Sequence, residues 1–196
     1  MPHLPEATAQ QLDLVSDQLT MAEAAMGFVP NSLKIMARRP ALMQGFLALA
    51  GALNGPSAIL PPQLRQLVAH IASAASGCRY CQAHTAHNAR RAGAQEEKIA
   101  AVWEYETSPL FSESERAALS LAQAAGSQPN MAGPEHFEAV RRWYSDDEVA
   151  EIVGVIALFG FLNRWNDTLA TPLEESPTAF AEAHLSDAGW TAGKHG

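Results

Sequence analysis

The sequence predicts an all-α fold, and three observations lead to that prediction. Apolar residues recur at helical spacing in one segment after another, and no stretch of useful length alternates polar and apolar residues as a β-strand does. Prolines and glycines fall between these periodic segments, where they begin and terminate helices. At 196 residues, 47% of them hydrophobic, the chain fits one soluble domain with a core of its own.

Two helices are expected at the start of the chain. Residues 6–26 contain no proline or glycine, so they should form one helix that ends at Gly27. The next residues form a turn, in which Asn31 or Ser32 can cap a short second helix. That second helix should run through Arg38.

The next two helices lead to the most distinctive stretch of the chain. Residues 41–54 follow Pro40 and carry an apolar stripe made of Leu42, Phe46, Leu49, Ala50 and Leu53. A further helix begins at Pro61-Pro62, because proline is tolerated in a first helical turn. Its apolar residues are Leu64, Leu67, Val68 and Ile71, and Gly77 terminates it.

The second half of the chain is predicted to be helical as well. A short helix should cover about residues 95–103, and others should start at Ser112 and Pro134, separated by a loop at residues 126–133. Ser145, followed by three acidic residues, caps the last long helix, which runs from Asp146 to about Thr171. Trp190 and residues 193–196 are expected to form a surface strap or a disordered end.

An internal similarity suggests two related helical halves. A shift of 85 residues places Leu64, Leu67 and Val68 over Val149, Ile152 and Val153, although any two amphipathic helices align at some offset. The same shift places Cys78 and Cys81 over Asn163 and Asn166. These asparagines belong to a polar cluster, residues 163–167, in an otherwise apolar helix. We interpret the cluster as a subunit contact in preference to a wall of the active pocket.

Cys78 and Cys81 are the only cysteines, and the chemistry of the chain is expected to centre on them. Residues 79–91 contain no helix breaker, so Cys78 should lie at the start of a helix and Cys81 in its first turn. Unpaired amide groups and the helix dipole lower a thiol pKa there, which favours Cys78 as the more acidic thiol. The spacing allows a disulfide, and His84 and His87 follow within two turns. The pair is therefore predicted to be reactive.

Composition excludes several classes of function. The net charge is −8 and basic residues occur at most in pairs, so nucleic acid is not an expected partner. The N-terminus lacks the pattern of a signal peptide, and no apolar run approaches the length of a membrane helix. A cytoplasmic location is expected, and in that reducing compartment a Cys-x-x-Cys pair is typically redox-active or metal-binding.

Five stretches together resemble the carboxymuconolactone decarboxylase and alkylhydroperoxidase D superfamily, in its peroxidase-related branch. They are residues 27–31, Pro40 with the helix after it, and residues 60–68, 76–85 and 161–167. The resemblance covers most of residues 20–185, the expected core of a single domain, 1–196, with an N-terminal helix and a C-terminal strap beside it. It implies a helical bundle that assembles as dimers, trimers or hexamers.

The resemblance also implies an activity and its residues. Cys81 would attack a hydroperoxide and Cys78 would resolve the sulfenic acid into a disulfide, with no other cofactor. A dithiol reductant, such as a lipoyl or thioredoxin-like protein, would then reset the pair. Two departures from the pattern stand out, because Gln66 replaces the glutamate of the proton relay and Thr85 replaces its histidine.

Two other histidines can substitute for the missing relay. His84 lies three residues after Cys81 on the same face of its helix, and His70 lies one turn beyond Gln66 on the preceding helix. His87 is a further candidate for the relay or the pocket, although it lies six residues past Cys81 and on a different face of the helix. General acid–base assistance typically contributes about 10²–10⁴ in rate, so a displaced relay should leave a weak peroxidase.

Two other functions stay open at this point. The first is a zinc site, because two sulfur and two nitrogen ligands are available from Cys78, Cys81, His84 and His87. At three-residue steps, however, these side chains spread over about half the circumference of one helix. A non-redox role is the second, either the lactone decarboxylase chemistry of the superfamily or a binding function of an oligomer. The leading hypothesis is an alkylhydroperoxidase-like oxidoreductase.

Overall fold

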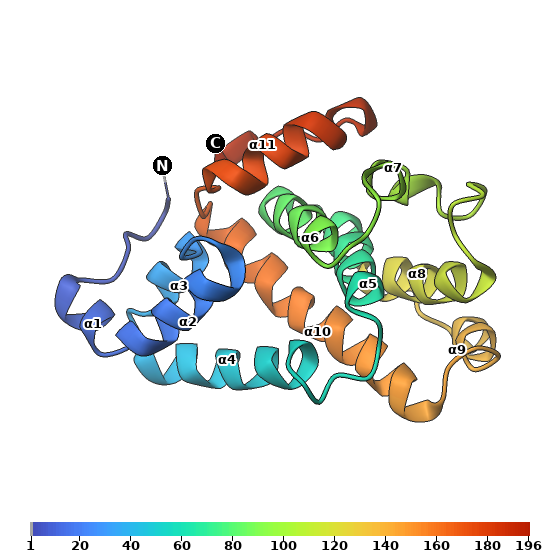
Figure 1. Cartoon of the computed structure of the whole chain (residues 1–196), viewed down its shortest axis with the longest axis horizontal. Coiled ribbons are helices and arrows are strands. Elements are labelled where there is room, and N and C mark those ends of the chain that lie inside the picture. The colour runs from blue at the N-terminus through green and yellow to red at the C-terminus, as the bar shows by residue number, and fades with distance from the viewer. Residues whose placement is uncertain (1) are drawn as a thin grey trace.

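The computed structural model describes residues 2–196, and Met1 lies outside the described part. It confirms the all-α fold, because the described residues form helices and no strand (Figure 1). Short 3₁₀ helices lie at Val102–Glu104, Ser186–Ala188 and Gly193–His195. The α-helices are α1 (Ala9–Asp13), α2 (Ser16–Met26), α3 (Asn31–Met36), α4 (Pro40–Asn54), α5 (Pro62–Ala75), α6 (Arg79–Arg91), α7 (Glu96–Ala100), α8 (Glu113–Gly126), α9 (Pro134–Val140), α10 (Asp146–Leu169) and α11 (Glu175–His184).

Helix α5 forms the centre of the main core. It packs against α6, α8 and α10, and Leu67, Val68 and Ile71 are fully buried among them. The contact between α5 and α8 is so close that a Cβ atom added at Gly126 would lie 2.7 Å from the carbonyl oxygen of Ala72. In the described residues, no helix has the length and apolar character needed to cross a membrane.

Helices α1 to α4 enclose a second, smaller core on the N-terminal side. Val15, Met36 and Met43 are its central residues, and Trp165 of α10 packs against it. Figure 1 shows α10 crossing the molecule between the two parts, from α9 to the region of α3. The long helix therefore brings the α2–α4 layer close to α5 and α6.

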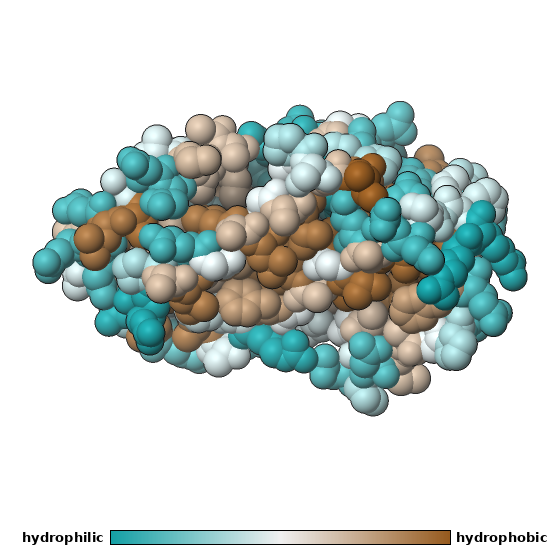
Figure 2. All heavy atoms as spheres, turned by 90° about the horizontal axis from the view of Figure 1, so that it is seen from below, coloured by the Kyte–Doolittle hydropathy of each residue, from teal (hydrophilic) through white to brown (hydrophobic). Residues whose placement is uncertain are grey.

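The apolar stripe of α4 is only partly buried. Met43 is the one residue of α4 that is fully buried, whereas Leu42 is 39% and Leu49 51% exposed. Val153 and Phe161 of α10 are exposed beside them, and Figure 2 shows hydrophobic atoms gathered on this face. An apolar surface of this kind marks an interaction site more often than a free surface.

Most helix boundaries agree with the sequence prediction, because local signals define them. Ser112 and Ser145 cap α8 and α10 as expected, each through a capping box with a glutamate three residues later. Helix α3 differs, because neither Asn31 nor Ser32 caps it with its own side chain. The carboxylate of Glu174 instead accepts a hydrogen bond from the backbone N–H of Asn31.

The prediction of one helix over residues 6–26 is wrong. The chain breaks at Leu14 and Val15, which turns Val15 into the smaller core with no exposed surface. Burial of this side chain outweighs the propensity of the segment to continue as one helix. Gly27 ends α2 in the left-handed conformation, as predicted.

The prediction for the C-terminal segment is also wrong. Residues 175–184 form α11, which packs against α6, and neither a surface strap nor a disordered end follows. Trp190 is buried and donates its indole N–H to the carbonyl oxygen of Arg79. His195 is buried as well, and the hydrogen bonds between its backbone and Leu173 and between its ring and Thr171 fix the chain end.

The two segments of the internal similarity do not share one arrangement. The first bends between α5 and α6 at residues 76–78, whereas the second runs straight through the corresponding positions as α10. Asn166, which corresponds to Cys81 in the 85-residue shift, nevertheless contacts it. The two corresponding positions therefore lie together, although the second segment does not form the helical hairpin of the first.

Candidate active site

Gly77 and Cys78 form the junction between α5 and α6. Gly77 has a left-handed φ of 79°, which turns the chain by a conformation that residues with a Cβ rarely adopt. Cys78 is the N-cap of α6, and its Sγ accepts a hydrogen bond from the backbone N–H of Cys81 at 3.4 Å. The predicted place of the two cysteines at a helix start is confirmed.

The surroundings of the two thiols shift their pKa values in opposite directions from that of a free cysteine. A hydrogen bond from the Cys81 thiol lowers the pKa of Cys78, and the backbone amides of Cys81 and Tyr80 add to this against the effect of burial. Burial raises the pKa of Cys81, and the neighbouring Cys78 raises it further. Of the two thiols, Cys78 is therefore the more acidic, and the thiol of Cys81 donates a hydrogen bond to its sulfur.

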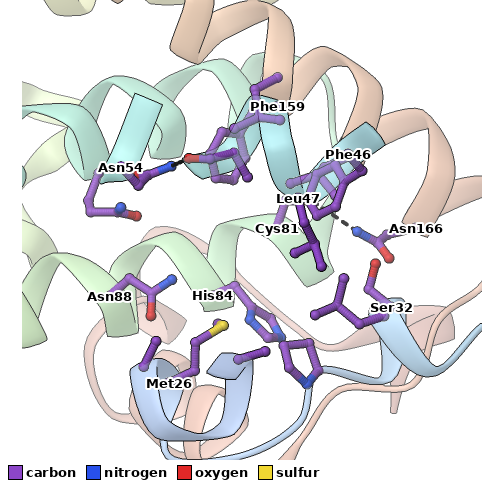
Figure 3. Close-up of a pocket in the computed structure, with 18 of the residues that line it drawn as sticks. Met26, Ser32, Phe46, Leu47, Asn54, Cys81, His84, Asn88, Phe159 and Asn166 are labelled. Atoms are coloured by element: carbon purple, nitrogen blue, oxygen red, sulfur yellow. Dashed lines mark hydrogen bonds between the residues drawn. The ribbon is translucent and has the colours of Figure 1, made fainter. Parts of the chain in front are cut away.

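Only Cys81 of the two faces a cavity. A cavity of about 510 Å³ lies between α2, α4, α6 and α10, and Cys81 lines it (Figure 3). Cys78 is not among its lining residues and has no exposed surface. It belongs to a buried cluster with Tyr80 and Cys81, against which Phe159, Leu162 and Leu173 pack. A small molecule in the cavity would therefore meet Cys81, with Cys78 behind it.

His84 lines the same cavity and forms an ion pair that the sequence did not predict. Its Nε2 lies 2.6 Å from Oε2 of Glu174, on the segment between α10 and α11. The other oxygen of Glu174 accepts hydrogen bonds from the hydroxyl of Tyr80 at 2.9 Å and from the backbone of Asn31. The ring of Tyr80 stacks on that of His84 with centroids 4.3 Å apart, so the imidazole is held from two sides.

The charge of Glu174 is stabilised in this position. Burial raises the pKa of Glu174, but the hydrogen bond and charge of His84, with the bonds from Asn31 and Tyr80, lower it by more. The carboxylate of Glu174 thus stays ionised and can accept a hydrogen bond from the facing nitrogen of His84. The structure thus brings a glutamate and a histidine together, although neither stands at the positions of the family pattern, where this chain has Gln66 and Thr85.

Sequence spacing gave no signal for Glu174. It lies 90 residues beyond His84, outside the predicted helices, and the neighbouring Glu175 has the same chemistry. The one available hint is its position directly after a segment, Thr171-Pro-Leu, that ends the long helix. Only the path of α10 through the molecule brings this segment to α6.

Asn166 of α10 contributes a polar side chain that contacts Cys81. Its Nδ2 donates to Sγ of Cys81 at 3.6 Å, which lowers the pKa of that thiol. Asn166 lines the cavity and is 1% exposed, and Asn163 is also buried within the chain. The preference for a subunit contact at these asparagines is therefore wrong, because Asn166 forms a wall of the pocket.

Gln66 lies in the cavity, whereas Thr85 and His70 do not. The amide oxygen of Gln66 is buried, and no residue among 2–196 hydrogen-bonds to it. Thr85 has no exposed surface and donates its hydroxyl to the carbonyl oxygens of Cys81 and Gln82. Nδ1 of His70 lies 3.0 Å from that hydroxyl, and its ring lines a separate cavity of about 260 Å³.

His87 lies apart from the thiols, and the zinc alternative loses its geometric basis. The ring of His87 contacts Phe28 and Phe180, and burial lowers its pKa. Across residues 2–196, no three His, Cys, Asp or Glu side chains are arranged so as to hold a metal ion. The structure thus does not bring the four candidate ligands around one point.

Comparison with known sequences identifies relatives of the chain. A model of the family "Carboxymuconolactone decarboxylase family" matches residues 40–124, which include α5, α6 and both cysteines. The uncharacterized protein YnjA of Escherichia coli is 24% identical over 148 residues, which cover 76% of this chain and 81% of that protein.

Comparison with solved structures adds two relatives. The debrominase Bmp8, as a cysteine-to-alanine variant in complex with 2,3,4-tribromopyrrole, is 32% identical, with a TM-score of 0.85 over 92% of this chain and 96% of that chain. An alkylhydroperoxidase AhpD core, described as an uncharacterized peroxidase-related protein from Ralstonia eutropha, is 23% identical. Its TM-score is 0.81 over 92% and 95% of the two chains, and it shows the shared fold.

Proposed function

This chain belongs to the carboxymuconolactone decarboxylase and alkylhydroperoxidase D superfamily, and we propose that it is a thiol-dependent oxidoreductase that reduces hydroperoxides. One observation carries the proposal. Cys81 and His84 line one apolar cavity, Cys78 shares a hydrogen bond with Cys81 from behind, and Glu174 holds His84 from outside the cavity lining. A nucleophile, a resolving thiol and a proton source are thus assembled around one space.

In the first step Cys81 is the nucleophile. Transfer of its proton to the hydrogen-bonded Cys78 generates the thiolate at the cavity. The thiolate attacks the terminal oxygen of R–O–O–H, so that an S–O bond forms and the O–O bond breaks. The alkoxide takes a proton from His84 and leaves as an alcohol, while Cys81 becomes a sulfenic acid.

In the second step Cys78 resolves the sulfenic acid. Its sulfur attacks Sγ of Cys81, an S–S bond forms, the S–O bond breaks, and the hydroxide leaves as water with the proton of Cys78. The two thiols supply two electrons, and the hydroperoxide is reduced to an alcohol and water. The Cys78–Cys81 disulfide is the only redox group that this cycle requires.

The polar groups of the cavity suit this chemistry. Glu174 holds His84 through Nε2, so the other ring nitrogen, Nδ1, is the one that would deliver a proton to the leaving oxygen as a general acid. Asn166 donates to Sγ of Cys81 and favours its thiolate form. Gln66 lines the cavity as well, so its amide would contact a bound hydroperoxide where the family glutamate moves a proton.

A dithiol reductant, either a lipoyl group or a thioredoxin-like protein, would return the disulfide to two thiols. Because Cys78 is inaccessible, that reductant would attack Cys81 through the cavity. A reducing compartment such as the cytoplasm suits such a cycle. The exposed apolar face of α4 and α10 suits assembly with a second copy, and size-exclusion chromatography with light scattering would measure the number of subunits.

Turnover assays test the proposal. With dithiothreitol as reductant, the wild-type protein should consume cumene hydroperoxide and form cumyl alcohol, and Cys81→Ala should be inactive. His84→Gln should lower kcat by about 10²-fold. His87→Gln is the matched control on the same helix and should retain the rate, because His87 lies outside the cavity. Wild-type activity equal to that of Cys81→Ala would refute the proposal.

A second candidate function is reductive dehalogenation of an aromatic ring. The 32% identity to a debrominase bound to tribromopyrrole favours it, as does the apolar cavity. Cys81 would attack bromine, so that an S–Br bond forms, the C–Br bond breaks and the carbon takes a proton. Cys78 would then form the disulfide and release bromide. Bromide release from a bromopyrrole, without reaction of cumene hydroperoxide, would favour this function over the first.

A further inference from the structure

The cavity runs along one face of α6. Cys81, His84, Asn88 and Arg91 line it from successive turns of that helix. Cys81 and Arg91 are ten residues apart, a rise of about 15 Å in an α-helix. Figure 3 shows Cys81 and Asn166 at one end of the cavity and Asn54 and Asn88 at the other. The site is therefore elongated, with the reactive sulfur at one end.

The two ends differ in exposure. Cys81 and Asn166 are almost fully buried, whereas Asn88 is half-buried and Asn54 and Arg91 are exposed. The buried end is the floor of the cavity, and the exposed end is its mouth. A ligand that enters at the mouth passes along the cavity to reach the thiol.

The walls between the mouth and the floor are apolar. They are formed by side chains from α2, α4 and α10, among them Met26, Leu47, Ala50, Phe159 and Leu162. Such walls stabilise a bound apolar chain or ring, because its surface is removed from water. A polar group of a ligand would lose its hydrogen bonds to water between these walls without gaining hydrogen bonds to the protein.

The mouth carries a positive charge. Among the described residues that line the cavity, Arg91 is the one Lys or Arg side chain. One of its terminal nitrogens donates to the carbonyl oxygen of Ala25 at 2.8 Å, which holds the guanidinium against the C-terminal end of α2. The guanidinium has five N–H donors, so others are available at the mouth. Asn54 and Asn88 place two amides at the same end.

We propose that the mouth is a carboxylate subsite centred on Arg91, and that the substrate is a hydroperoxide of an apolar, medium-chain carboxylic acid. The carboxylate binds at the mouth, the chain lies along the apolar walls, and the peroxide reaches Cys81 at the floor. This inference rests on the proposed function and adds the substrate class. It also gives a reason why the basic residue lies at the open end of an apolar cavity.

The test uses ligands that carry no peroxide, so it does not depend on redox activity. Isothermal titration calorimetry of the reduced wild-type protein at pH 7.5 and low ionic strength compares decanoate with 1-decanol. We expect decanoate to bind about fivefold more tightly, and the difference to shrink as salt is added. Butyrate, which is too short to reach from the mouth along the walls, should bind much more weakly than decanoate.

Two neighbouring arginines provide the variant and its control. Arg91→Gln should abolish the preference for decanoate and leave the affinity for decanol unchanged. Arg90→Gln should keep the preference, because Arg90 does not line the cavity and pairs with Glu96. Arg91→Lys should keep part of the preference, because it keeps the positive charge. It therefore separates the effect of the charge from the effect of losing the hydrogen bond to Ala25.

The outcomes separate the two proposals. Equal affinity of wild-type protein for decanoate and decanol, or a preference that survives in Arg91→Gln, overturns the carboxylate subsite. A preference for decanoate in a protein that never reacts with hydroperoxides upholds the subsite and refutes the redox function. Peroxidase activity in a protein that shows no preference for decanoate upholds the redox function and refutes the carboxylate subsite.

Discussion

Glu174, on the segment that follows the longest helix, lies 2.6 Å from the imidazole of His84 on α6. The same carboxylate accepts a hydrogen bond from Tyr80 and another from the first turn of α3. One side chain therefore joins three parts of the fold and orients the histidine of the cavity. The following predictions test this arrangement and its neighbours.

Glu174→Gln should lower both stability and activity. It removes a charge that is 10% exposed and serves three donors, so we expect a loss of about 2 kcal/mol in the free energy of unfolding. The folded pKa of Glu174 is lowered, so its contribution is present above pH 4.5 and is lost as pH falls through the folded pKa. Urea unfolding at pH 7 and pH 3 measures this difference. A variant equal in stability to wild type at pH 7 would contradict it.

The cysteine variants should change reactivity in opposite directions. Cys78→Ser removes the neighbour that raises the pKa of Cys81, so alkylation of Cys81 by iodoacetamide at pH 7 should be roughly tenfold faster. Cys81→Ser removes the hydrogen bond that lowers the pKa of Cys78, which also has no access to the cavity. Mass spectrometry of alkylated protein gives both rates, and faster alkylation of Cys78 in Cys81→Ser would show the assignment to be reversed.

His70 should make stability depend on pH. Burial lowers its pKa from 6.5 to about 4, so between these values the unfolded chain binds a proton that the folded chain does not. Stability should therefore fall by about 3 kcal/mol as pH decreases from 6.5 to 4. His70→Gln should flatten this part of the profile in urea unfolding, and an unchanged slope would exclude His70 as its source.

Two glycine variants should test the packing of α5. Gly126→Ala places a methyl group 2.7 Å from a carbonyl oxygen of α5, so thermal unfolding should show a loss of about 1–3 kcal/mol. Gly51→Ala on α4 meets no atom within 4 Å and should gain up to about 1 kcal/mol through helix propensity. If both variants behaved alike, the close approach of α8 to α5 would not be supported.

The sequence predicted those features that depend on nearby residues. Capping serines, prolines and Gly77 mark helix ends by local chemistry, and they also place Cys78 at the N-cap of α6. Glu174 could not be predicted in this way, because its contact with His84 depends on the course of the chain over 90 residues.

Hydrophobicity alone also could not predict which apolar side chains are buried. The apolar stripe of α4 does not reveal that Leu49 is exposed, since periodicity shows a face but not what covers it. Val15 is the opposite case, a buried residue whose burial the sequence did not reveal. Its burial interrupts a segment that helix propensity alone would continue as one helix. Such choices are made by tertiary packing.

The central claim is that Cys81 reacts first and Cys78 resolves it. Titration of free thiols before and after one equivalent of cumene hydroperoxide tests this directly. We predict the loss of two thiols per chain in the wild type, and a sulfenic acid on Cys81 in Cys78→Ser, trapped with dimedone. Thiols that remain reduced, or a sulfenic acid formed on Cys78 in Cys81→Ser, would contradict the claim.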